Sequence, residues 1–234
     1  MSDALVPILI VTGVGGSIAW RKIDTAGGLV GGAIAYVLYR GVGWLGISLI
    51  GTFFVLGTLA SLWKLRQKET LGVAEARHAQ RGWRNVVANA GVASIIAGVS
   101  WMYPEYNALG ELLAAAAFAA ALSDTWSSEL GNVYGRNFYH VLTGKRDQRG
   151  RDGVVSLVGS LAGVAGSSLI ALLYAVFLGF DRNFWIVLLA GVVGNLVDSI
   201  LGATWERRGW LGNHGVNFLN TLAAALTAYF LVKY

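Results

Sequence analysis

The sequence predicts an all-α protein, a polytopic transmembrane helical bundle of about eight helices, within a range of six to eight. Of its 234 residues, 55% are hydrophobic and 13% are charged, whereas about 25% are charged in an ordinary soluble domain. The hydrophobic residues fall into long runs, and a spanning helix needs about 20 predominantly apolar residues. Most of the chain must therefore face lipid rather than water.

Eight apolar segments approach or reach this length, separated by polar connections. The first lacks the basic stretch that precedes a secretory signal, so we expect it to be a retained helix. No linker divides the chain, and we predict one integral membrane domain over residues 1–234. The expected segments are 4–20, 26–40, 43–63, 85–103, 108–124, 153–179, 184–205 and 211–232.

The basic residues predict how these segments are oriented. Four connections, 21–25, 64–84, 125–152 and 206–210, carry 15 of the 18 Lys and Arg residues. Because these connections alternate with the others, the positive-inside rule places them in the cytoplasm and both termini outside. In a prokaryote the membrane would be the inner membrane of the cell. The net charge of +5 follows this topology, and we expect no nucleic-acid partner.

Composition also excludes several kinds of site. The chain has no cysteine, so it has no disulfide, thiolate metal site or cysteine nucleophile. Its three histidines, His78, His140 and His214, are too scattered to suggest zinc. Glycine, at 32 residues, suits a membrane bundle, where small residues let helices approach closely.

Two aspartates interrupt apolar segments near their expected cytoplasmic ends. Asp124 lies in the polar string 123–131, and Asp198 lies in the string 194–199. An aspartate at the centre of a spanning helix costs about 2.5–3.5 kcal/mol, so each must face protein, water or a cation. Oxygen ligands without His or Cys suit Mg²⁺, and we predict that the pair binds it. The alternative is that the aspartates cap helices or join neighbouring ones. Other polar candidates nearby are Ser128, Glu129, Asn195, Ser199 and Asn89.

A loop rich in glycine and basic residues, Gly144 to Gly153, lies between the two aspartates. Glycine frees backbone N–H groups for anion binding, and arginine grips phosphate with a planar fork. No Walker A pattern is present, so any nucleotide site is not a P-loop. The alternative is a topology determinant or a contact with anionic lipid. The predicted phosphate-binding residues here are Lys145, Arg146, Arg149, Arg151 and Asp152.

Two further polar strings complete the expected cytoplasmic face. One contains Glu75 and Arg84, and the other begins the last segment with Asn213 and Asn217. The first turn of a helix is a natural phosphate site. Asn217 and Asn220 lie three residues apart on one helical face, however, and such residues more often join helices by hydrogen bonds.

These strings resemble a known family of integral membrane proteins, domain-of-unknown-function family 92, which includes plant phytyl-phosphate kinase. A more distant similarity links Ser123-Asp124, Gly135-Arg136 and Gly194 to Asp198 to membrane CTP-dependent cytidylyltransferases. That similarity implies CTP and Mg²⁺, with Asp124 and Asp198 as ligands. The blocks that resemble the family are Lys68 to Glu75, Arg84 to Gly91, Ser123 to Gly131, Arg151 to Gly163, Gly194 to Thr204 and Asn213 to Asn217.

The resemblance implies a Mg²⁺-dependent kinase that phosphorylates an isoprenyl (phytyl-like) monophosphate to the diphosphate, with CTP or another nucleoside triphosphate as donor. We expect Glu129 to orient a water or a second metal and the basic loop to bind phosphates, on the cytoplasmic face. One alternative is a CTP-dependent cytidylyltransferase that makes a CDP-lipid. An alternative from another class is a lipid or small-molecule transporter. The sequence leaves the oligomeric state open, and a homodimer is one alternative.

Overall fold

The computed structural model describes residues 5–74 and 81–234. Within them, six helices are long and apolar enough to cross a membrane, and a shorter apolar helix precedes them. The prediction of a polytopic helical bundle is confirmed. The helices are α1 Leu5–Ala19, α2 Thr25–Leu62, α3 Leu65–Thr70, α4 Trp83–Met102, α5 Asn107–Tyr134, α6 Leu157–Leu178, α7 Arg182–Leu201 and α8 Asn213–Lys233. The remaining elements are a 3₁₀ turn η1 Pro104–Tyr106, strands β1 Tyr139–His140 and β2 Val154–Val155, and a π-helical segment η2 Gly202–Glu206.

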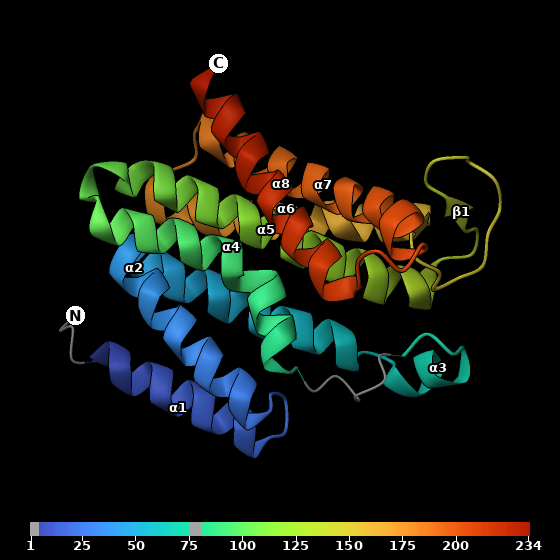
Figure 1. Cartoon of the computed structure of the whole chain (residues 1–234), viewed down its shortest axis with the longest axis horizontal. Coiled ribbons are helices and arrows are strands. Elements are labelled where there is room, and N and C mark those ends of the chain that lie inside the picture. Colours follow the sequence, from blue (N-terminus) through green and yellow to red (C-terminus); the bar gives the residue numbers. More distant parts are fainter. Residues whose placement is uncertain (1–4, 75–80) are drawn as a thin grey trace.

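Helix α2 combines two expected segments, 26–40 and 43–63, and bends sharply between them. The helical geometry is interrupted at Val42 and at Gly43, whose φ of 64° is one that glycine adopts readily. A Cβ placed on Gly46 would lie 2.7 Å from the carbonyl oxygen of Leu38, although eight residues span about 12 Å along a straight helix. The second arm therefore turns back from the first (Figure 1).

The connections from α4 to α5 and from α6 to α7 lie at one end of the bundle, whereas α3, the loop between α5 and α6 and the turn between α7 and α8 gather at the opposite end. Figure 1 places α3, β1 and the turn between α7 and α8 towards that end, while α1 begins and α8 ends away from it. The connections at this end are the basic ones expected in the cytoplasm. Which side of the membrane they face stays a prediction.

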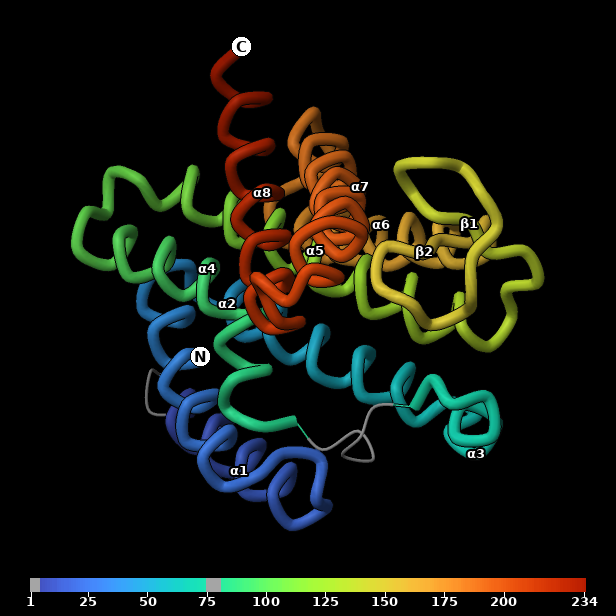
Figure 2. Tube along the Cα trace, turned by 45° about the vertical axis from the view of Figure 1, so that its right-hand side comes forward, coloured from blue at the N-terminus to red at the C-terminus, as the bar shows by residue number. Residues whose placement is uncertain are grey.

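The centre of the bundle is α5, which packs against α2, α4, α6, α7 and α8 (Figure 2). Residues 114–122 on this helix, mostly alanines, have no exposed surface. Glycines lie at its contacts with neighbouring helices. A Cβ on Gly194 of α7 would lie 2.5 Å from the Ala120 side chain, and a Cβ on Gly131 of α5 itself would lie 2.8 Å from the backbone of Gly159 in α6. Small residues thus let five helices reach one central helix.

Helix α5 also continues beyond the predicted segment 108–124 to Tyr134. The polar string 123–131 is therefore helical, and it forms the last turns of the central helix rather than part of a loop. At the end of α7, the segment 202–206 is a π-helix, a widened turn that is often found at functional sites.

Gly41 tests this packing, because α2 and α4 meet there at backbone distance. A Cβ at Gly41 would lie 1.9 Å from the carbonyl oxygen of Ala97. We expect Gly41→Ala to lower the free energy of unfolding by about 1–3 kcal/mol through overpacking. The control is Gly13→Ala, which meets nothing within 4 Å. Thermal unfolding in detergent measures both, and an unchanged midpoint for Gly41→Ala would contradict the close approach.

Sidedness can be tested in this chain without removing native cysteines. Gln67 on α3 and Gln148 in the basic loop are exposed at the end that holds the basic connections, and Glu105 is exposed in η1 between α4 and α5. Single cysteines at Gln67 and Gln148 should react with an impermeant maleimide only from the cytoplasm, and one at Glu105 only from outside. Labelling of Gln67→Cys and Gln148→Cys from opposite sides would refute the arrangement.

Candidate functional site

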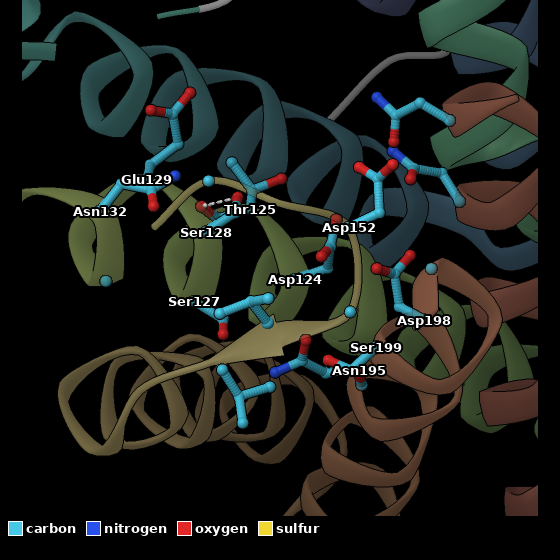
Figure 3. Close-up of a pocket in the computed structure, with 18 of the residues that line it drawn as sticks. Asp124, Thr125, Ser127, Ser128, Glu129, Asn132, Asp152, Asn195, Asp198 and Ser199 are labelled. Atoms are coloured by element: carbon cyan, nitrogen blue, oxygen red, sulfur yellow. Dashed lines mark hydrogen bonds between the residues drawn. The ribbon is translucent and has the colours of Figure 1, made fainter. Parts of the chain in front are cut away.

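A polar cavity of about 360 Å³ opens at the end of the bundle where the basic connections gather. Its walls come from the ends of α2, α4, α5, α7 and α8 and from the loop between α5 and α6. Carboxylate, amide and hydroxyl side chains line it (Figure 3). Exposing these polar groups to lipid would cost free energy. The bundle instead encloses them around a polar cavity.

Asp124 on α5 and Asp198 on α7 meet in this cavity. Both side chains line the cavity, and Figure 3 shows both pointing into the space between the two helices. Asn220 of α8, which has no exposed surface, donates a hydrogen bond of 3.0 Å to Asp198. Two carboxylates in one cavity repel each other unless a proton or a cation lies between them. The pair is therefore suited to binding a cation.

The donor set around the two aspartates fits Mg²⁺. Asp152 and Glu206 also line the cavity, but no group of three or more His, Asp or Glu side chains in residues 5–74 and 81–234 is arranged to hold a metal. Mg²⁺ usually takes one or two carboxylates and completes its shell with water and substrate phosphates, so two aspartates suffice. Amide oxygens of Asn89 and Asn217 are buried in the wall without a partner among the described residues and add further oxygen atoms.

Glu129 lies one turn and a half beyond Asp124 on α5 and is held by a buried lysine. Lys68 is 1% exposed, and its ammonium group donates to Glu129 at 2.5 Å and to the carbonyl oxygens of Ala60 and Ser61 at 2.7 and 3.1 Å. All three N–H donors of the lysine are thus used. The last turn of α2 is joined to α5 through this lysine. No pattern of residues indicates this pairing in advance, because Lys68 is one of several basic residues in the connection 64–84.

The loop between α5 and α6 is fastened to the end of α7. Arg207 donates to the carboxylate of Asp147 at 2.8 Å and to the carbonyl oxygen of Asp152 at 2.7 Å. The hydrogen bond from Arg207 lowers the pKa of Asp147 to about 2, so this attachment stays charged until the pH falls towards that value. Gly153, with φ 67°, packs against the backbone of Ala203, where a Cβ would lie 2.3 Å from the amide nitrogen. These contacts hold Asp152 at the cavity.

The basic residues of this loop do not all face the cavity. Arg151 lines it. Arg149 instead donates to the carbonyl oxygens of Asn132 and Gly135, each at 2.9 Å, and lies over the Phe138 ring. Its guanidinium therefore closes the C-terminal end of α5. Lys145 and Arg146 are exposed and outside the cavity lining. Phosphate binding by these four basic residues stays a prediction. Arg151 is the best placed of them to bind phosphate, because it lines the cavity.

Arg81 lies in the connection 64–84, whose basic residues predicted only the topology, and it also lines the cavity. Its N–H donates to the carbonyl oxygen of Lys22 at 3.0 Å, and its carbonyl accepts from the N–H of Asp24 at 3.1 Å. The side chain is 9% exposed, with its guanidinium 4.8 Å from the centre of the Phe53 ring. The absence of a side chain at Gly57 provides the space for the guanidinium group, since a Cβ there would lie 2.5 Å from one of its nitrogens. A buried positive charge is thereby placed in the cavity wall.

The structure brings most predicted site residues together. Glu75 lies outside the described residues, and Arg84 lines a separate groove between α4 and α8. Asn220 joins helices, as expected for an asparagine on that face. The predicted residues that line the cavity are Asp124, Asp198, Glu129, Ser128, Arg151, Asp152, Asn89, Asn195, Ser199, Asn213 and Asn217. Lining residues that were not predicted include Arg81, Asn85, Thr125, Ser127, Asn132 and Glu206. Asn85 had a usable signal, because it lies one helical turn before Asn89 on the same face.

Comparisons with known proteins agree with this architecture. The family described as "Integral membrane protein DUF92" matches residues 8–225. The chain is 33% identical to Protein VTE6, chloroplastic, of Arabidopsis thaliana over 204 residues, which cover 84% of this chain and 61% of that protein. This chain therefore spans less than two thirds of that relative. It is 35% identical to an uncharacterized membrane protein of Synechocystis, covering 83% of this chain and 77% of the relative. It is 31% identical to one of Methanocaldococcus jannaschii, covering 88% and 84%. No solved structure matches the chain.

The buried pair of Lys68 and Glu129 can be tested by stability. We expect Lys68→Met to lower the free energy of unfolding by about 1–3 kcal/mol, because it leaves the partly buried Glu129 carboxylate and the Ala60 and Ser61 carbonyls without their donor. The double variant Lys68→Met with Glu129→Gln should recover part of that loss. Lys145→Met, at an exposed position, is the matched control. Chemical unfolding in detergent measures all three, and equal effects of Lys68→Met and Lys145→Met would show that the pair does not hold α2 to α5.

Proposed function

Because the chain belongs to the DUF92 family of integral membrane proteins, we propose that it is a membrane-embedded, Mg²⁺-dependent kinase. It transfers a phosphoryl group from CTP, or another nucleoside triphosphate, to an isoprenyl monophosphate of the phytyl type. The observation that carries the proposal is the meeting of Asp124 and Asp198 in a polar cavity that also contains Arg81 and Arg151. The resemblance to plant phytyl-phosphate kinase supports the choice of substrate.

The chemistry requires positioning and charge compensation more than a general base. A phosphate monoester has a second pKa near 6, so the lipid phosphate is a dianionic nucleophile at neutral pH. One of its oxygens attacks the γ-phosphorus of the donor, the bond from that phosphorus to the β-bridging oxygen breaks, and the nucleoside diphosphate leaves with the electron pair. The absence of a histidine from the cavity lining among the described residues is compatible with this reaction.

Four charged residues of the cavity would bring the two polyanions together. Asp124 and Asp198 would hold Mg²⁺, which screens the phosphate charge when bound. Arg81, just before α4, and Arg151, in the loop between α5 and α6, would bind phosphate oxygens through their guanidinium groups. Arg81 in particular is already ordered by Phe53 and Gly57, so little side-chain entropy is lost when phosphate binds.

We place the cavity on the cytoplasmic side, where nucleoside triphosphates are available. The basic connections around it support this orientation through the positive-inside rule. Donor and acceptor then reach the site from different phases, the nucleotide from water and the lipid from the bilayer.

The decisive experiment supplies purified protein in lipid nanodiscs with Mg²⁺, each nucleoside triphosphate in turn and phytyl monophosphate, and identifies products by mass. We expect phytyl diphosphate and a nucleoside diphosphate, with Asp124→Asn and Asp198→Asn each reducing turnover by about a thousandfold or more while the protein stays folded. Gln67→Asn, on the exposed face of α3, is the control. Pyrophosphate and a CDP-lipid would identify a cytidylyltransferase instead, and near-normal turnover in both aspartate variants would refute the metal site.

A further inference from the structure

A second depression lies on the outer side of the seam between α4 and α8. It is an open groove of about 280 Å³ whose floor is apolar, built by Val87, Ala88 and Phe218. Trp83 and Gly215 complete its walls. None of these side chains lines the polar cavity.

The groove and the cavity are separated only by the two helices. Ala88 lines the groove and its neighbour Asn89 lines the cavity; likewise Phe218 lines the groove and Asn217 the cavity. Successive residues of a helix point about 100° apart, so one helix can form a wall of both spaces. The groove and the cavity are therefore back to back at the first two turns of α4 and α8.

The depth of the groove indicates a ligand that comes from the bilayer. Both helices are long and apolar enough to span the membrane, and the groove lies at their first turns. Trp83, which is 46% exposed, stands at the start of α4, the level at which tryptophan anchors at headgroups. Val87 and Phe218, one turn further along their helices, face the acyl region.

The mouth of the groove is positively charged. Arg84 is exposed there, 5.5 Å from the centre of the Trp83 ring, and His214 adds a further hydrogen-bonding side chain. The positive ends of the α4 and α8 dipoles point to the same place. An occupant with an apolar tail and an anionic head matches both parts of this surface.

We propose that the groove holds the first isoprenyl units of the lipid monophosphate while its phosphate reaches past the start of α4 and α8 into the cavity. The inference rests on the proposed function, since it names the path by which that substrate enters. It assigns the tail to the α4–α8 seam rather than to the glycine-rich contacts around α5. Those contacts are closed by backbone, as between Gly131 and Gly159.

A filling variant tests the groove through activity. Gly215 lines the groove, and the nearest atoms to a Cβ placed on it belong to the Leu211 side chain, at 3.4 Å or more, which is an ordinary contact distance. Gly215→Leu therefore adds a side chain at the groove without a clash at Cβ. We expect it to raise KM for phytyl phosphate by about tenfold, corresponding to roughly two methylene groups kept from burial. Turnover of methyl phosphate, which has no isoprenyl unit to place in the groove, should change little. Gly212→Leu, with nothing within 4 Å of its Cβ and outside the groove lining, is the matched control.

A crosslinking measurement tests the same groove without requiring turnover. A prenyl monophosphate with a diazirine on its second isoprenyl unit, photolysed in nanodiscs, should label residues of the groove, Val87 or Phe218 foremost. Excess phytyl phosphate should suppress the labelling, whereas excess phosphatidylglycerol should not. Labelling confined to α6 or α7, or competition by any anionic phospholipid, would overturn the proposal. Specific labelling of the groove in a protein that phosphorylates nothing would retain the lipid site and refute the kinase, so the two failures are distinguishable.

Discussion

The close packing of α5 against five neighbouring helices is the constraint on which the rest of the structure depends. Lipid offers no hydrophobic drive for helices to associate, so their contacts rely on dispersion and close backbone approach. Alanines over residues 114–122 and facing glycines such as Gly191 and Gly194 allow that approach. Because the same helix continues to Tyr134, its polar last turns are carried into the middle of the bundle's end. Asp124 is thereby surrounded by protein on all sides but one.

The charged residues near this end are stabilised in three different ways. Lys68 and Glu129 neutralise each other at the cavity wall, with the remaining donors of the lysine satisfied by helix carbonyls. Arg207 and Asp147 form a more exposed pair that fastens the loop. Asp124 and Asp198 have no such compensation from each other, since both are carboxylates. The first two arrangements complete the structure, whereas the third requires a proton or a cation, and this difference separates the structural charges from the functional ones.

The geometry also explains how one site can serve substrates from two phases. The cavity is polar and opens where the basic connections lie, which suits a nucleotide and phosphate groups. The groove is apolar and opens along the span, which suits an isoprenyl chain. Only the first turns of α4 and α8 lie between them. A lipid phosphate that reaches past the start of α4 and α8 would enter the cavity while its tail stays in the bilayer.

The sequence by itself determined the helical membrane fold, because hydrophobic length and the placement of basic residues act locally along the chain. It also indicated Asp124 and Asp198, since a carboxylate inside an apolar run is costly wherever it lies. Only the tertiary structure decided which polar residues meet. Arg81 reaches the cavity because Gly57, on α2, has no side chain to block its guanidinium group. Arg149 instead donates its hydrogen bonds to carbonyl oxygens at the end of α5. Such outcomes depend on distances between helices, which no local pattern of residues encodes.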